Sequence, residues 1–161
     1  TFEGHIRTLF INRNRTLSVM ESCTGGLLAS ALTDSPGAAD YLKGGIVTYW
    51  TQAKIEAGVP AEVIEQYGVV SAETAVAMAQ AIRERFGTDY GLGITGVAGP
   101  DPQEDKPVGT VHIGIAGPGG FTSSISTQIN SDRATVKRRA VTSALLLLRR
   151  TLLTQEPLDN A

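Results

Sequence analysis

The segment from Thr16 to Gly26, TLSVMESCTGG, carries the residue types that nucleophilic catalysis needs. A short apolar run ends at an acid, a hydroxyl and a thiol, and a threonine and two glycines follow. This pattern predicts a strand, Leu17 to Ser22, that turns into a helix. Ser22 would then lie at the carboxyl end of the strand, beside free backbone N–H groups that favour anions. The segment suits a nucleophile beside an anion-binding turn, although many glycine-rich turns only let a helix pack closely.

A serine nucleophile needs a base within hydrogen-bonding reach, and the sequence offers few. Of the two histidines, His5 is near the N-terminus and His112 is inside a predicted strand, where a structural hydrogen bond is the commoner role. Lys54 follows a second predicted strand by one turn and could point back toward Ser22. It acts as a base only if burial or a nearby cation lowers its pKa from about 10.4 toward neutrality. The alternative is an ordinary surface lysine.

Two further side chains near these residues have open roles. Tyr49, at the end of the second predicted strand, would relay a proton or hold the leaving group, or else keep its hydroxyl in water. Cys23 is a stronger nucleophile than serine, and a helix N-terminus would lower its pKa. Alternation along the strand turns Cys23 toward the helix layer if Ser22 faces the crevice, so we interpret Cys23 as a small buried apolar residue.

The composition indicates one domain over residues 1–161, in a reduced, cytoplasmic setting. The formal net charge is −2 and Cys23 is the only cysteine, so an internal disulfide is excluded and bulk electrostatics do not favour nucleic acid. Two histidines cannot form a zinc-type cluster, and we expect no metal or cofactor. The longest apolar run, Ala144 to Leu148, is far shorter than the roughly 20 residues that span a bilayer, so no membrane is expected as a partner.

Strand and helix patterns alternate along the chain and predict a three-layer α/β/α domain with a mixed, mostly parallel sheet. In such sheets the ligand crevice lies beyond the carboxyl ends of the strands, where Ser22, Tyr49 and Thr95 would meet. The predicted strands are Leu17–Ser22, Gly45–Tyr49, Tyr90–Thr95, Thr110–Ala116 and Phe121–Gln128. The predicted helices are Phe2–Asn12, Gly25–Leu32, Gln52–Ala57, Ala61–Gln66, a helix from the cap Ser71 to Phe86, and one from about Ser131.

Five motifs, in this order, resemble the CinA C-terminal domain family: Glu21–Gly26, Gly44–Tyr49 followed by Lys54, Gly68–Ser71, Gly93–Gly96 with Ala98–Pro100, and Lys106–Val111. The resemblance covers Leu17 to Leu153. It implies a nicotinamide-nucleotide amidase of the PncC type, which hydrolyses nicotinamide mononucleotide to nicotinic acid mononucleotide and ammonia. It also implies a serine nucleophile and a lysine base, which by motif are Ser22 and Lys54, with Tyr49 beside them, and a homodimer.

The implied reaction is metal-independent acyl transfer, in which backbone N–H groups near Thr24 and Gly25, with Thr95, stabilise the oxyanion. Gly26 would shape the helix entry. The substrate's ribose and phosphate would bind the loop from Gly96 to Gly99 and Arg133 at the start of the last helix. A structural alternative pairs Arg133 with Asp132 or Glu104, and Lys106 would serve the loop rather than the ligand.

Two departures from the family pattern bear on activity. Trp50-Thr51-Gln52-Ala53 stands where the family has small polar residues, although alternation predicts that Trp50 points out of the crevice. Pro100-Asp101-Pro102 replaces a Gly-Gly pair in the loop over the expected ribose phosphate. The competing functions are a non-catalytic nucleotide-sensing or competence- and DNA-damage-associated interaction module, and another amidohydrolase or phosphate-ester hydrolase that uses Ser22.

Overall fold

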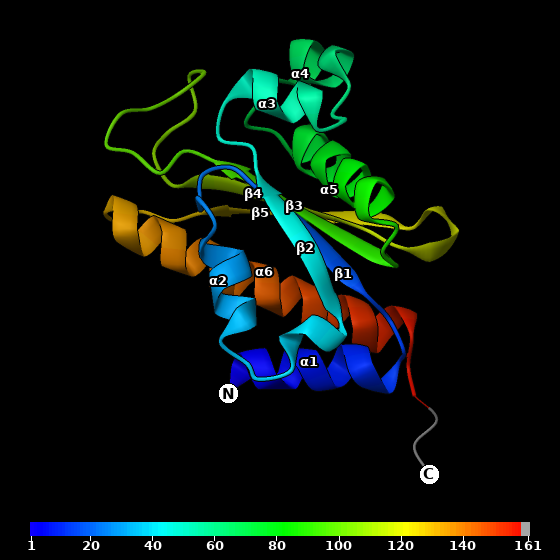
Figure 1. Cartoon of the computed structure of the whole chain (residues 1–161). Helices are drawn as coiled ribbons and strands as arrows, with labels where there is room; N and C mark the ends of the chain where they lie inside the picture. Colours follow the sequence, from blue (N-terminus) through cyan, green and yellow to red (C-terminus); the bar gives the residue numbers. More distant parts are fainter. Residues whose placement is uncertain (159–161) are drawn as a thin grey trace.

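A computed structural model describes residues 1–158 and shows a five-stranded sheet with helices on both faces (Figure 1). The strands lie in the order β2-β1-β3-β4-β5. Strand β1 is parallel to β2 and to β3, whereas β4 is antiparallel to β3 and β5. Only β4 therefore runs against the others, and the predicted mixed sheet is confirmed. The strands are β1 (Leu17–Glu21), β2 (Leu42–Val47), β3 (Tyr90–Gly96), β4 (Thr110–Ala116) and β5 (Thr122–Gln128).

The helices form the two outer layers of the predicted α/β/α arrangement. Figure 1 shows α1, α2 and α6 on one side of the sheet and α5, with the short α3 and α4, on the other. The larger buried cluster joins the sheet to α1, α2 and α6, and a smaller cluster around Met20 and Met78 packs under α5. The helices are α1 (Phe2–Asn12), α2 (Leu27–Thr33), α3 (Thr51–Glu56), α4 (Ala61–Tyr67), α5 (Ala72–Phe86) and α6 (Arg133–Gln155), with 3-10 turns η1 (Ala38–Asp40) and η2 (Pro118–Gly120).

Glycines in β3 allow α5 to lie directly on the sheet. A Cβ atom at Gly91 would be 2.2 Å from the carbonyl oxygen of Ala79, and one at Gly93 would be 2.4 Å from that of Ala75. Strands β1 and β3 are almost wholly buried, because helices cover both of their faces. The carboxyl ends of β1, β2 and β3 consequently open at one edge of the sheet, as the sequence predicts.

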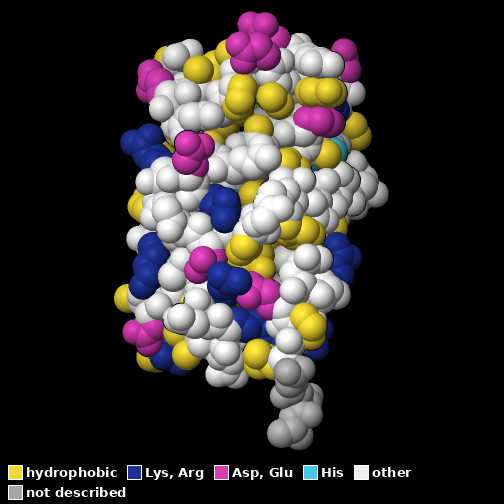
Figure 2. Space-filling model, turned by 90° about the vertical axis from the view of Figure 1, so that its right-hand side faces the viewer, with side chains coloured by type: hydrophobic (Ala, Val, Ile, Leu, Met, Phe, Trp, Pro, Cys, Tyr) yellow, Lys and Arg dark blue, Asp and Glu magenta, His cyan; other side chains and the backbone are white. Residues whose placement is uncertain are grey.

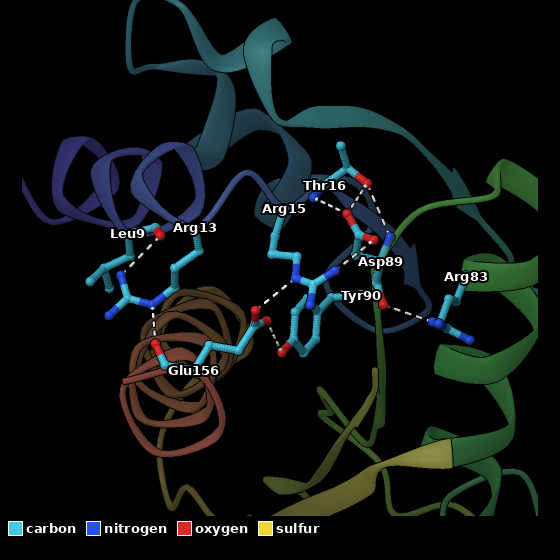
Figure 3. Close-up of polar contacts among 8 residues, drawn as sticks. All are labelled: Leu9, Arg13, Arg15, Thr16, Arg83, Asp89, Tyr90 and Glu156. Atoms are coloured by element: carbon cyan, nitrogen blue, oxygen red, sulfur yellow. Dashed lines mark hydrogen bonds and ion pairs between the residues drawn. The ribbon is translucent and has the colours of Figure 1, made fainter. Parts of the chain in front are cut away.

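A polar network fixes the end of α6 at the opposite edge of the sheet (Figure 3). The carboxylate of Glu156 accepts hydrogen bonds from Arg15 Nε at 2.7 Å and from the Tyr90 hydroxyl at 2.5 Å. Arg13 Nε donates to the Glu156 backbone carbonyl at 2.8 Å, and Arg15 Nη1 lies 3.4 Å from Asp89 Oδ1. These contacts attach the C-terminal end of α6 to the segment between α1 and β1, and they hold the helix whose first residue is Arg133.

The predicted elements agree with the structure except at some boundaries. Strand β2 starts at Leu42 and ends at Val47, so Tyr49 lies in the connection to α3 rather than in the strand. Strand β1 ends at Glu21, one residue before Ser22. Within residues 1–158, no helix is long and apolar enough to cross a bilayer. On the face drawn in Figure 2, Lys and Arg side chains are interspersed with Asp and Glu, in keeping with the net charge of −2.

Candidate active site

Ser22 and Lys54 form a hydrogen-bonded pair at the carboxyl edge of the sheet. The backbone N–H of Ser22 donates to the carbonyl of Ile94 in β3 at 3.0 Å, which holds the serine as an extension of β1. Lys54 points back from α3, and its Nζ lies 2.9 Å from Ser22 Oγ. The lysine is completely buried, and Ser22 is 7% exposed. The structure therefore joins two residues that are 32 positions apart in the sequence.

The surroundings of Lys54 favour its neutral form. Burial lowers the pKa of the ammonium group to about 8, although Cys23 and Glu104 act in the opposite direction. Nζ also contacts the backbone carbonyls of Thr48 at 2.6 Å and Tyr49 at 3.5 Å. After losing one proton, the amine retains two N–H donors for these carbonyls and has a lone pair for Ser22. This arrangement gives the lysine the geometry of a general base.

Cys23 belongs to the core, as predicted. Its side chain is 6% exposed and packs in the cluster between the sheet and α1, α2 and α6. Burial raises the pKa of the thiol to about 12, and the negative charge of Glu21 acts in the same direction. A thiol with that pKa is protonated at neutral pH and is a poor nucleophile. Ser22 is therefore the better placed nucleophile of the two.

Glu21 is the residue near the site that the sequence reasoning left without a role. Its buried carboxylate accepts hydrogen bonds from the Thr24 hydroxyl at 2.6 Å and from the N–H groups of Leu28 at 2.8 Å and Ala29 at 3.0 Å. The predicted anion-binding turn is thus wrong in one respect, because the chain's own carboxylate already occupies the start of α2. The sequence signal for this role was an acidic residue immediately before a glycine-rich turn and a helix.

The predicted oxyanion residues Thr24, Gly25 and Gly26 shape this turn and lie outside the cavity lining. Thr24 donates its hydroxyl to Glu21, and the Gly25 N–H donates to the Ser22 carbonyl at 3.0 Å. Gly25 and Gly26 have φ angles of 62° and 103°, in the region that favours glycine. The two glycines therefore allow the chain to reverse between β1 and α2.

A cavity of about 130 Å³ opens beside Ser22. It brings together Ser22, Tyr49, Thr95, Gly96, Gly99 and Arg133 from the predicted set. The rest of its wall is Cys23, Thr51, Val69, Val70, Val97, Ala98, Asp101 and Gln103. A larger groove of about 720 Å³, lined by Arg83, Asp89 and Phe121 among others, contains none of the predicted site residues. The cavity at Ser22 is therefore the candidate active site.

Thr95 lies in the cavity wall with its hydroxyl already engaged. The hydroxyl donates to the Val69 carbonyl at 3.0 Å, so it can only accept a hydrogen bond from a ligand.

Glu104 holds the loop over the cavity, because its carboxylate accepts from the N–H groups of Val69 and Val70, each at 2.9 Å. Partial burial raises the Glu104 pKa, but these N–H groups and Lys106 outweigh it and leave the pKa below its ordinary value. Lys106 thus serves the loop, as predicted.

Arg133 stands at the mouth of the cavity as the first residue of α6. Its Nη2 donates to the Tyr49 hydroxyl at 2.6 Å, and its Nη1 donates to the Gly99 carbonyl. The alternative pairing with Asp132 or Glu104 is wrong, because Asp132 instead caps α6 through the Thr135 N–H and Glu104 binds the loop. Arg133 as a whole is exposed to solvent at this mouth.

The structure shows where Tyr49 and Trp50 lie relative to Lys54 and the cavity. Only the backbone carbonyl of Tyr49 reaches Lys54, while its hydroxyl is bound by Arg133 at the mouth. Trp50 is 70% exposed and does not line the cavity, so the prediction that it points outward is confirmed. Asp101, from the Pro-Asp-Pro departure, is in the cavity wall.

The two histidines lie away from the candidate site. His112 Nδ1 is 2.7 Å from Ser126 Oγ, and burial lowers the pKa of its imidazole. His5 Nε2 accepts from Arg149 on α6. Within residues 1–158, no three His, Cys, Asp or Glu side chains gather where they could hold a metal ion. Lys54 is consequently the base that the geometry supports.

Comparison with known proteins identifies relatives over nearly the whole chain. The family model described as the CinA C-terminal domain matches residues 1–152. A CinA-like protein of Frankia casuarinae is 52% identical over 153 residues, which are 94% of this chain and 35% of the relative. A CinA-like protein of Synechocystis is 47% identical over 135 residues, covering 83% of this chain and 32% of the relative. The chain thus spans about a third of the length of these curated relatives.

Solved structures reproduce the fold at lower identity. A competence-damaged protein (CinA) superfamily protein from Klebsiella pneumoniae superposes with a TM-score of 0.91 at 30% identity, over 95% of this chain and 96% of that chain. The corresponding superfamily protein from Escherichia coli gives a TM-score of 0.87 at 34% identity, over 92% of this chain and 88% of that chain.

Proposed function

Because the chain belongs to the CinA C-terminal domain family, we propose that it is an amidase that hydrolyses nicotinamide mononucleotide to nicotinic acid mononucleotide and ammonia. The observation that carries this proposal is the 2.9 Å contact between the buried Lys54 amine and the Ser22 hydroxyl. A hydroxyl with a desolvated amine beside it is the pair of groups that acyl transfer requires. The family includes enzymes of this kind, and the Ser22–Lys54 contact supports the proposal for this chain.

The proposed reaction begins when neutral Lys54 takes the proton of Ser22. The serine oxygen then forms a bond to the carboxamide carbon and gives a tetrahedral oxyanion. Lys54 returns the proton to the departing nitrogen, the C–N bond breaks, and ammonia leaves the acyl-enzyme. Water, deprotonated by the same amine, attacks the ester and releases the carboxylic acid and the Ser22 hydroxyl.

We assign the oxyanion to backbone N–H groups of the cavity wall rather than to Gly25. The Gly25 N–H is already bound to the Ser22 carbonyl. Cys23 follows the nucleophile directly and lines the cavity, and its N–H donates to no backbone carbonyl of the described residues. A donor in this position stabilises the oxyanion in many acyl-transfer enzymes. The N–H groups of Ala98 and Gly99, two other lining residues, are the candidates for a second donor.

The cavity is too small to enclose the whole substrate, so we place one part of the substrate inside the cavity and the rest at its mouth. About 130 Å³ is well below the roughly 300–1,000 Å³ of pockets that enclose a drug-sized ligand. The cavity suits the nicotinamide ring, and the ribose phosphate would extend to the mouth beside Arg133. Arginine binds phosphate through two parallel hydrogen bonds. The phosphate would therefore replace the Tyr49 hydroxyl on the guanidinium group.

The proposal is tested by incubating the purified chain with nicotinamide mononucleotide at pH 8.5 and measuring ammonia and the acid product. We expect turnover by the wild type and by Cys23→Ala, because this substitution keeps the backbone N–H of the cavity wall and removes only a thiol that is protonated at neutral pH. Calorimetry with nicotinamide mononucleotide distinguishes the amidase from the alternative, a nucleotide-sensing module. Binding without product in the wild type would support a nucleotide-sensing module and overturn the amidase proposal.

A further inference from the structure

We propose that Glu21 is a positioning residue that fixes Ser22 in the geometry for attack. The inference rests on the proposed role of Ser22 as the nucleophile. Glu21 precedes Ser22 and is 1% exposed, so its carboxylate acts on the protein interior rather than on solvent or substrate. It does not line the cavity, and its effect on the reaction must pass through neighbouring groups.

The carboxylate side of Glu21 closes the turn that carries the nucleophile. One oxygen accepts from the Thr24 hydroxyl and the Leu28 N–H, and the other accepts from the Ala29 N–H. These donors lie after Ser22, in the turn and in the first turn of α2. The carboxylate thus draws the start of α2 against the end of β1. Hydrogen bonds to an ionised acceptor are shorter and stronger than neutral ones, so the turn has little freedom.

The backbone side of Glu21 sets the position of the base. Its carbonyl accepts from the Thr48 N–H at 2.8 Å. The Thr48 carbonyl in turn accepts from Lys54 Nζ at 2.6 Å, and the same Nζ contacts Ser22 Oγ. A closed path of bonds therefore runs through Ser22, Glu21, Thr48 and Lys54. Glu21 therefore helps to fix the positions of both Ser22 and Lys54.

The cost of a buried carboxylate supports a role beyond packing. A charge removed from water is destabilising unless hydrogen bonds or an ion pair compensate it. Within the described residues, Glu21 has no Lys, Arg or His at ion-pair distance and depends on its three donors. The carboxylate also satisfies the positive end of α2.

The test measures the nucleophilicity of Ser22 without relying on the proposed substrate. A fluorophosphonate probe forms a covalent bond to an activated serine, and intact-mass and peptide analysis give its rate and its site. The variants are Glu21→Gln, which keeps the shape and removes the charge, and Thr24→Val, which removes the 2.6 Å bond alone. Leu152→Ala, a buried change in the distant part of α6, is the control for a general loss of stability.

We expect the plateau rate of labelling to fall about 10–100-fold in Glu21→Gln and about 3–10-fold in Thr24→Val, because small misplacements of reacting groups have effects of this size. The labelling midpoint near pH 8, set by Lys54, should stay in place, and the control should label at the wild-type rate while folded. With nicotinamide mononucleotide as substrate, kcat should fall with little change in KM.

The outcomes separate this inference from the proposed function. A wild type that is not labelled, or is labelled at Cys23, overturns the role of Ser22 and both proposals with it. A wild type labelled at Ser22, with equal plateaus in the folded Glu21→Gln variant, overturns the positioning role alone. If Glu21→Gln does not fold, Thr24→Val decides, because an unchanged plateau in that variant contradicts the inference.

Discussion

The guanidinium Nη2 of Arg133 donates a hydrogen bond to the Tyr49 hydroxyl at 2.6 Å, and this contact spans the mouth of the cavity that contains Ser22. It connects the first residue of α6 to the segment between β2 and α3. The same guanidinium group donates to the Gly99 carbonyl in the loop over the cavity. Three chain segments therefore meet at the one cation that our account assigns to the substrate phosphate.

Removing this cation should weaken recognition of the phosphate and leave the chemistry intact. For Arg133→Ala we expect kcat/KM for nicotinamide mononucleotide to fall about 10–100-fold, since hydrogen bonds to charged groups contribute about 1.5–3 kcal/mol. Turnover of nicotinamide riboside, which lacks the phosphate, should change little. Arg138→Ala, on the same helix but outside the cavity, is the matched control. An equal loss for both substrates would contradict the assignment.

The Tyr49→Phe variant tests whether the Tyr49 hydroxyl only binds Arg133 at the mouth or also relays a proton in the reaction. The hydroxyl competes with the substrate phosphate for Arg133, so its removal should lower KM for the nucleotide about 2–10-fold, the equivalent of one ordinary hydrogen bond. Because that hydroxyl is bound at the mouth and not to Lys54, kcat should stay within about twofold. Steady-state kinetics measures both values. A large fall in kcat at unchanged KM would instead show that the hydroxyl transfers a proton.

The pH dependence of turnover should follow the ionisation of Lys54. Burial lowers the pKa of this amine to about 8, and only the neutral form accepts the Ser22 proton. At pH 7 about a tenth of the amine is neutral, so kcat/KM should rise about eightfold between pH 6.5 and 7.5, reach about half of its maximum near pH 8 and level off above about pH 9. The profile is measured between pH 6.5 and 9.5. A flat profile over this range would exclude Lys54 as the base.

The same ionisation should appear in the stability of the protein. The folded pKa of Lys54 is about 8 against an ordinary value of 10.5, so between these values the unfolded chain binds more protons than the folded one. Stability due to this group therefore increases with pH in that window. Between pH 7 and 9.5, the free energy of unfolding of the wild type should rise by about 2 kcal/mol relative to Lys54→Met. Urea unfolding at both pH values gives the difference, and equal differences would contradict the shift.

Much of the fold and the meeting of Ser22 with Lys54 could be predicted because the signals are local. An apolar run before Ser22 and another before Tyr49 indicate strands, and parallel strands place their carboxyl ends at one edge. The shortage of histidines left Lys54 as the plausible base. Cys23 was placed in the core by simple alternation, and its 6% exposure agrees.

The contacts that complete the site depend on tertiary packing and could not be predicted from the sequence. Tyr49 and Arg133 are 84 residues apart, and nothing in either segment specifies the other. Glu21 belongs to the first motif, but the motif does not specify that its carboxylate accepts from the N–H groups of α2, which begins at Leu27, two residues later than predicted. Thr24, Gly25 and Gly26 precede this helix in the turn and do not line the cavity.

The proposed roles of Ser22 as nucleophile and Lys54 as its base are tested by measuring the acid product. Release of nicotinic acid mononucleotide from nicotinamide mononucleotide is followed at pH 8.5 for the wild type, Ser22→Ala and Lys54→Ala, with Cys23→Ala as control. We expect turnover in the wild type and the control, and a loss of at least about 10³-fold in kcat for both site variants, as for other catalytic units that act together. Turnover by Ser22→Ala at the wild-type rate, or none by the wild type, would contradict it.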